Sequence, residues 1–159
     1  MNTVAESALA ANAKNAGSAA NPASAGNLFS HVCEGDTRYE SGGLRDFFLY
    51  RDLGIAAATG GQVVAQLVKA NMAPEEGTGW HRHEANFHIV IMLKGWARFM
   101  YEQEVTLVKA GDCVHQRPGI RHFLFDYSPD MEYLEVVGPA DFTSVGVDGP
   151  CAVPAPGKW

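Results

Sequence analysis

Two histidines stand two residues apart in the tetrapeptide Trp80-His81-Arg82-His83. Residues two apart on an extended segment point to the same face, so His81 and His83 can converge on one metal ion. The pair alone is weak evidence, because an HxH pair in a strand also arises on surfaces and in ordinary packing. Its meaning depends on the residues that follow, the first of which is a third histidine, His88.

The residues beyond His83 keep a regular spacing. Four residues separate His83 from His88, and six separate His88 from Gly95. Farther on, five residues separate Gly111 from the hexapeptide Arg117-Pro118-Gly119-Ile120-Arg121-His122, and three more lead to Asp126. These spacings resemble the two motifs of the cupins. The first cupin motif is HxH, three or four residues, Glu, six residues and Gly, and the second is Gly, five residues, PxGxxH, three residues and Asn.

The resemblance implies a fold and a set of metal ligands. The fold is an all-β, double-stranded β-helix of the jelly-roll kind, a small RmlC-like barrel whose concave interior forms a pocket. The implied ligands of the metal are His81, His83 and His122. The glutamate position of the first motif holds His88, which we predict as a fourth ligand. The alternative for His88 is a histidine that forms hydrogen bonds in the pocket without touching the metal.

Two further positions depart from the family pattern, since Arg117 replaces the motif proline and Asp126 replaces the terminal asparagine. The donor set bears on the metal. Imidazole nitrogens suit one divalent transition metal ion better than Mg or Ca, which prefer oxygen ligands. Fe(II) is favoured, with Zn, Ni, Mn, Co or Cu as alternatives. Without the motif carboxylate the complex is one unit more positive, so we expect a small anionic ligand such as an enolate or carboxylate.

The resemblance leaves three functions open. Cupin sites built only from histidines are associated with dioxygenases that cleave carbon–carbon bonds in enolisable dicarbonyls and hydroxy ketones, and this is the favoured prediction. A barrel that binds a metal or small ligand without catalysis, as a sensor, is the first alternative. A sugar isomerase or epimerase is the second. Fold alone does not choose among them.

The rest of the chain has the rhythm of an all-β protein. From Leu44 onward, short segments rich in β-branched and aromatic residues alternate with Gly, Pro, Asn and Asp turn signals. The predicted strands are Leu44–Leu53, Gln62–Ala70, Trp80–His83, Phe87–Leu93, Ala97–Glu102, Val105–Val108, Cys113–Gln116, Arg121–Tyr127 and Met131–Val137. The segment Phe87–Leu93 is apolar at both parities, which is typical of a strand covered on both faces. In cupins a second subunit often provides that cover, so we expect a homodimer.

Length and composition set the domain organisation. A chain of 159 residues with 47% hydrophobic content fits one domain. We predict an Ala/Asn/Ser-rich arm over residues 1–27, the cupin barrel over residues 28–145, and a Pro/Gly-rich tail over residues 146–159.

Charge and cysteine content limit the partners and the compartment. The net charge is −6 and no run of Lys or Arg occurs, so nucleic acid is not an expected partner. The longest apolar run falls far short of the roughly 20 residues that span a bilayer, so no membrane association is expected. The chain has 3 cysteines without CxxC spacing, which favours a reducing cytoplasm.

Overall fold

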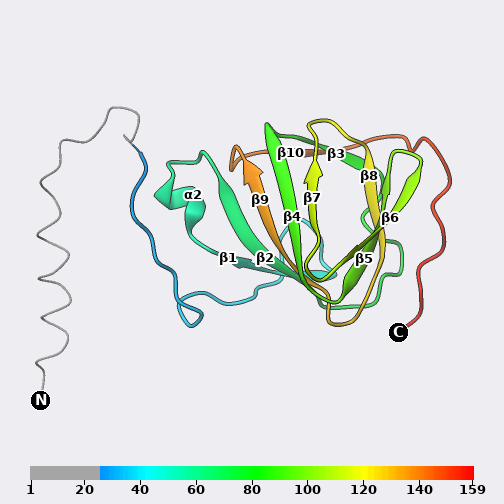
Figure 1. Cartoon of the computed structure of the whole chain (residues 1–159), viewed down its shortest axis with the longest axis horizontal. Coiled ribbons are helices and arrows are strands. Elements are labelled where there is room, and N and C mark those ends of the chain that lie inside the picture. Colours follow the sequence, from blue (N-terminus) through cyan, green and yellow to red (C-terminus); the bar gives the residue numbers. More distant parts are fainter. Residues whose placement is uncertain (1–25) are drawn as a thin grey trace, which may run out of the picture.

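The computed structural model describes residues 26–159, so almost all of the predicted arm over residues 1–27 lies outside the described residues. Strands dominate the described part of the chain (Figure 1). In chain order the elements are β1 (Phe48–Asp52), α2 (Ile55–Ala58), β2 (Val64–Ala70), β3 (His81–Glu84), β4 (Phe87–Lys94), β5 (Trp96–Tyr101), β6 (Glu104–Lys109), β7 (Cys113–Gln116), β8 (His122–Tyr127), β9 (Glu132–Gly138) and β10 (Thr143–Gly146).

The strands form two five-stranded antiparallel sheets. One has the order β1-β2-β9-β4-β7 and the other the order β10-β3-β8-β5-β6. Most hydrogen-bonded neighbours are distant in sequence, as β9 is from both β2 and β4. Apart from β1–β2 and β5–β6, each strand is followed in the chain by a strand of the other sheet (Figure 1). This arrangement is a jelly-roll barrel. The prediction of an all-β jelly roll is confirmed.

Alternation along the strands builds the interior. In β4 the buried residues are His88, Val90 and Met92, while Phe87 and Ile89 on the other parity are partly covered. The apolar core continues through residues of both sheets, including Val68, Phe99 and Leu124. Since one strand carries both His88 and core residues on the same face, the polar site is built directly into the core.

Some boundaries differ from the predicted ones. Strand β1 begins at Phe48 rather than Leu44, because residues 44–47 form a turn in which Phe48 N–H donates to the Arg45 carbonyl at 3.3 Å. Two elements were not predicted. Helix α2 is a single turn, too short to show periodicity, and the edge strand β10 has only one large apolar residue, Val145. Strand β10 nevertheless pairs with the whole of β3, which carries two of the predicted ligands.

No strand is formed after Gly146 in the described chain, yet the tail is attached to the barrel. The Gly157 N–H donates to Oδ1 of Asp126 at 2.9 Å, and the Trp159 indole N–H donates to the Tyr127 carbonyl at 3.0 Å. The other carboxylate oxygen of Asp126 lies 3.2 Å from Nη1 of Arg98. The departure from the family asparagine at Asp126 therefore has a structural role, which is to fix the tail and a neighbouring strand.

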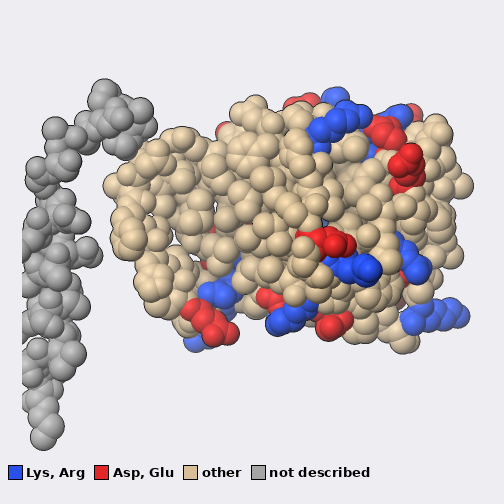
Figure 2. All heavy atoms as spheres, viewed as in Figure 1, with Lys and Arg blue, Asp and Glu red and all other residues tan. Residues whose placement is uncertain are grey.

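Acidic and basic side chains lie next to one another on the face shown in Figure 2, without a broad patch of one sign. Within residues 26–159, no helix has both the length and the apolar character needed to cross a bilayer.

Candidate metal centre

Three of the predicted ligands meet at the junction of β3 and β8. His81 is directly opposite His122 in the antiparallel register, and His83 follows two residues later on the same face of β3. The ring centroids are 4.2 Å apart for His81 and His122, 4.9 Å for His83 and His122, and 5.0 Å for His81 and His83. One ring nitrogen from each of these residues lies within 4.8 Å of the other two, so the three buried histidines can hold one metal ion.

Backbone contacts orient two of these rings. Nδ1 of His81 is 2.8 Å from the Gly79 carbonyl, and Nδ1 of His122 is 3.0 Å from the Ile120 carbonyl. A carbonyl oxygen only accepts, so both Nδ1 atoms carry the proton and both Nε2 atoms keep a free lone pair. In addition, Nδ1 of His83 is buried without a hydrogen-bond partner. An unpartnered polar atom in a buried cluster fits a site that binds an ion.

The protonation state of the cluster also suits a metal. Burial, with a smaller contribution from positive charge on neighbouring histidines, lowers the pKa of His81, His83 and His122 to about 3 each. Neutral imidazole is the form that ligates. At neutral pH the three rings are therefore already in the form that a metal ion requires.

His88 lies beside this cluster, on β4 of the opposite sheet. Its side chain is buried, and its ring centroid is 4.9 Å from that of His83. Its Nε2 is 2.9 Å from Oε1 of Glu135, an ion-pair distance, but the ring N–H is not aligned for a hydrogen bond and neither ring nitrogen has one. The group of ligand atoms that lie within 4.8 Å of one another includes the other three histidines and not His88. Ligation by His88 stays a prediction.

Glu135 is the residue of the site that sequence reasoning missed. It lies on β9 between Tyr133 and Val137 in the inward parity, is only 8% exposed, and accepts a hydrogen bond from the Gln66 amide at 2.6 Å. Burial raises its pKa, but the contacts with His88 and Gln66 outweigh burial and bring the pKa below the ordinary value. The available signal was a glutamate at an inward position of β9, between apolar residues on both sides.

The position of Glu135 corrects the charge argument made from the motif alone. The motif lacks a carboxylate, but the cavity contains one on a different strand. The same cavity is lined by Arg45, whose positive charge offsets that of Glu135. The 2+ charge of a bound metal would then remain uncompensated by the protein, and the anionic ligand stays a prediction.

The cavity that contains these groups is small. Its volume is about 40 Å³, and apolar side chains of the core complete its wall, among them Phe48, Phe99 and Leu124. A volume of this size holds on the order of one to three water molecules. A metal ion and a small reacting group fit there, while the bulk of a larger ligand would have to lie elsewhere.

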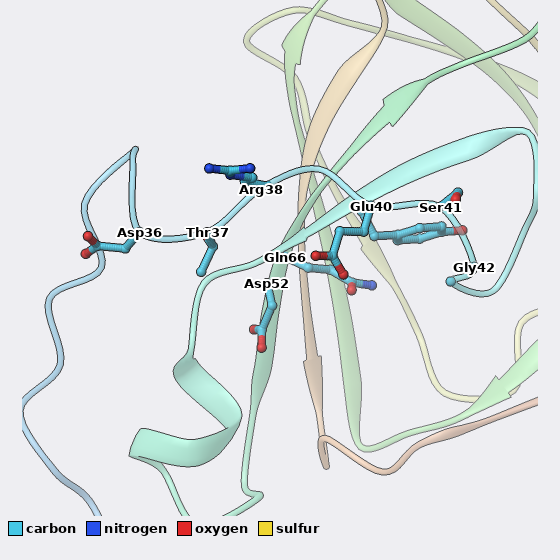
Figure 3. A pocket seen from close by; sticks show the side chains of 10 residues that line it. Asp36, Thr37, Arg38, Glu40, Ser41, Gly42, Asp52 and Gln66 are labelled. Atoms are coloured by element: carbon cyan, nitrogen blue, oxygen red, sulfur yellow. The ribbon is translucent and has the colours of Figure 1, made fainter.

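Figure 3 shows a larger pocket, with a volume of about 560 Å³. Its lining comes from the segment before β1 and from β1 and β2, with Asp36, Arg38, Glu40 and Asp52 among the polar residues. Tyr50 lines both the pocket and the histidine cavity. Gln66, another lining residue, is hydrogen-bonded to Glu135 in the cavity. The two spaces therefore share Tyr50 and are linked through the Gln66–Glu135 hydrogen bond.

The remaining histidines and the cysteines lie outside the cavity. His31 and His115 are exposed. All three cysteines have free thiols, Cys33 and Cys113 being exposed and Cys151 partly buried. Arg117, the departure from the motif proline, forms an ion pair with Glu102 at 3.7 Å.

Comparison with a family model gives a match over residues 68–137, and that model describes a cupin domain. The matched segment contains both sequence motifs and all four predicted ligands. The comparison with curated proteins gave no match.

Solved structures resemble the barrel in fold. The polyketide cyclase RemF from Streptomyces resistomycificus matches with a TM-score of 0.60 and 18% identity, over 76% of this chain and 87% of that one. KdgF from Halomonas sp. matches with a TM-score of 0.57 and 17% identity, over 70% of this chain and 94% of that one. An RmlC-like cupin protein from Ralstonia eutropha matches with a TM-score of 0.55 and 18% identity, over 70% of each chain.

Proposed function

We propose that this chain, which matches a cupin-domain model over residues 68–137, is a metal-dependent dioxygenase of the cupin superfamily acting on a small enolisable dicarbonyl or hydroxy ketone. The observation that supports the proposal is the convergence of three neutral, buried histidines in a cavity that leaves room beside them. A site with three protein ligands keeps coordination positions free for substrate, whereas a closed four-ligand site is typical of structural metals.

The contact between His88 and Glu135 supports open positions at the metal. With Nε2 of His88 only 2.9 Å from the carboxylate, that nitrogen already has a charged neighbour. We therefore favour a three-histidine centre in which His88 acts on Glu135 rather than on the ion. Fe(II) is the favoured occupant, and when bound it would supply Lewis acidity toward the substrate oxygens and a redox-active centre for O2.

Glu135 gives the cavity a base for enolisation. Its carboxylate is ionised, lies beside His88 and accepts a hydrogen bond from Gln66, so it can accept the proton that a dicarbonyl loses from carbon. The apolar wall around it, with Phe99 and Leu124, excludes bulk water and strengthens the interactions of charge inside the cavity. The larger pocket beyond Tyr50 offers space for the rest of the substrate.

We also propose a cytoplasmic homodimer. The outer face of the β1-β2-β9-β4-β7 sheet presents partly exposed apolar residues on three adjacent strands, namely Leu67, Ile89, Ile91, Leu134 and Val136. A contiguous apolar face of this kind is typical of an interface between subunits. Light scattering after size exclusion should give twice the chain mass, and Ile89→Glu together with Val136→Glu should give a monomer.

A second candidate function is proton-transfer chemistry without O2, such as cyclisation, dehydration or isomerisation. The buried Glu135–His88 contact favours it, because a carboxylate and an imidazole side by side can remove and return a proton. Structural neighbours include the polyketide cyclase RemF and the nucleoside dehydratase Pac13, the latter with a TM-score of 0.52 and 14% identity. Both candidates begin with the same enolising step. In the dioxygenase the enolate then reacts with O2, and in the second candidate it is protonated or rearranged without O2.

Oxygen uptake distinguishes the candidates. Protein loaded with Fe(II) under anaerobic conditions is mixed with a panel of 1,3-dicarbonyls and hydroxyacetophenones, and O2 is then admitted. The dioxygenase proposal expects O2 consumption in step with substrate loss, and none with His122→Ala. Substrate loss without O2 would favour the second candidate, and neither change with any member of the panel would favour a barrel that only binds.

A further inference from the structure

Arg45 lies in the wall of the histidine cavity, although neither motif contains it. It belongs to the segment that precedes β1 and lines the cavity together with the triad and Glu135. A cationic side chain thus stands beside the position where substrate would meet the metal.

The backbone of Arg45 is fixed. Its N–H donates to the Tyr50 hydroxyl at 3.0 Å, and its carbonyl accepts from the Phe48 N–H at 3.3 Å. The Tyr50 ring in turn packs against Gly43, where an added Cβ would lie 2.2 Å from the ring. The side chain therefore starts from a well-held position on the cavity wall, which reduces the entropy lost when it binds a ligand.

The guanidinium has donors to spare. Nε of Arg45 is buried without a hydrogen-bond partner. No ion pair joins Arg45 to an acidic side chain in residues 26–159, in contrast to Arg82, Arg98, Arg117 and Arg121. A buried donor without a partner is costly, and a guanidinium fork matches a carboxylate in geometry and charge. An anionic group in the cavity would both accept a hydrogen bond from the unpartnered Nε and pair with the guanidinium charge.

From this geometry we infer that Arg45 is the anion anchor of the site, and that it selects substrates carrying a carboxylate next to the enolisable carbonyl. The inference rests on the proposed function for the identity of the reacting group, but not on the presence of O2 chemistry. The substrate class narrows from dicarbonyls in general to oxo acids. Arg45 is a specificity-determining residue, while the triad holds the metal.

Two probes that differ by one group test the inference. 2,4-Dioxopentanoate and pentane-2,4-dione share the β-diketone unit, and the first has a carboxylate where the second has a methyl group. Their binding to the Zn(II)-loaded full chain is measured by calorimetry for the wild type, Arg45→Met, Arg45→Lys and Arg82→Met. Arg82 is the control, since it is an exposed arginine, paired with Glu84, that lines neither the histidine cavity nor the larger pocket.

We expect Arg45→Met to weaken 2,4-dioxopentanoate binding by about 10- to 100-fold, the usual cost of a lost hydrogen bond to a charged group. Pentane-2,4-dione should change by less than about twofold, Arg45→Lys should recover part of the loss, and Arg82→Met should behave as wild type. Unchanged 2,4-dioxopentanoate affinity in Arg45→Met would overturn the inference. An equal loss for both probes, or a wild type that binds no 2,4-dioxopentanoate, would also overturn it.

The result is independent of the oxygen-uptake experiment. Zn(II) does not support O2 chemistry, so a failed dioxygenase screen leaves the probe comparison intact. Conversely, O2 uptake with neutral and carboxylate substrates at equal KM would support the proposed function and contradict the role of Arg45.

Discussion

His122 occupies the position at which the two sequence motifs meet in space. It faces His81 across the β3–β8 pairing, and the Ile120 carbonyl fixes the ring so that Nε2 is free. We expect His122→Ala to weaken Zn(II) or Fe(II) binding by more than about 100-fold, beyond the usual loss for a residue that only supports a ligand. Competition with a chromophoric chelator measures the affinity, and the exposed His115→Ala serves as control.

His88→Ala separates the two roles considered for that residue. Because Nε2 of His88 already faces Glu135, we expect metal affinity to fall by less than about tenfold. Enolisation should suffer instead, seen as slower deuterium exchange at the carbon between the carbonyls of pentane-2,4-dione. A loss of metal affinity equal to that of His122→Ala would show that His88 is a fourth ligand, as its motif position predicts.

The buried histidines also predict a pH dependence for the metal-free protein. Their folded pKa of about 3 lies below the unfolded value of about 6.5, so the unfolded chain binds more protons between these limits. Stability is therefore complete above pH 6.5 and declines as the pH falls, by up to about 1.4 kcal/mol per pH unit for each histidine. Urea unfolding at pH 7, 6 and 5 measures it. The same slope in His81→Gln/His83→Gln/His122→Gln would contradict the assignment.

At the scale of elements, Gly95, the glycine of the first motif, forms the turn between β4 and β5. Its φ is +62°, and an added Cβ would lie 2.1 Å from Oγ of Ser128. Gly111, the glycine of the second motif, also has a positive φ, +95°, but nothing lies within 4 Å of the added Cβ. The two glycines thus share a positive φ, but only Gly95 lacks space for a side chain.

We expect Gly111→Ala to cost about 1 kcal/mol in unfolding free energy, from backbone conformation alone. Gly95→Ala should lower the unfolding free energy by about 3 kcal/mol or more, since the clash with Ser128 adds to the cost of the backbone conformation. Denaturant unfolding of both variants checks the difference. Equal costs would mean that the turn relaxes around the new methyl group.

The elements that the sequence predicts well are those with strong patterns. β7 (Cys113–Gln116) has its predicted bounds, and β4 and β8 differ from theirs by one residue at an end. The edge strand β10 escaped prediction because four residues with one large apolar side chain carry no alternation. Its place beside β3 depends on pairing over a long sequence separation, which local patterns do not record.

The residues of the site also divide into those that local sequence patterns predict and those that only the folded barrel brings together. Two motifs at fixed spacing sufficed to predict His81, His83 and His122, because strand geometry turns the spacing into a shared face. Glu135 and Arg45 come from β9 and from the segment before β1, and only the closed barrel brings them to the cavity. Arg45 has no neighbouring sequence signal that distinguishes it from an ordinary charged residue, and the signal for Glu135 is only its position in the alternation of β9.

For the whole molecule, a bound metal should raise the melting temperature, because the triad joins β3 and β8 only in the folded chain. At a free metal concentration of about 100 times Kd, linkage predicts about 2.7 kcal/mol of stabilisation, on the order of 8 °C for a barrel of this size. Calorimetric scans with and without Zn(II) measure the shift. His122→Ala should show almost none, and a wild type that shows no shift would mean that metal does not bind the folded barrel.

The tail contributes to the stability of the whole molecule through Asp126. Its carboxylate accepts the Gly157 N–H and contacts Arg98, so one buried side chain connects the tail, β8 and β5. We expect Asp126→Ala to lower the unfolding free energy by about 2 kcal/mol, from lost hydrogen bonds to a charged group. Faster proteolysis after Val147 should accompany the loss. Unchanged stability would mean that the tail lies on the barrel without supporting it.

Anomalous scattering from crystals of the untagged protein loaded with Fe(II) or Zn(II) tests the metal centre most directly. One peak is expected, at a bonding distance of about 2.0 to 2.2 Å from a ring nitrogen of each of His81, His83 and His122. The absence of a peak among these three rings in metal-loaded crystals, or a peak bound only by other residues, would contradict the metal centre.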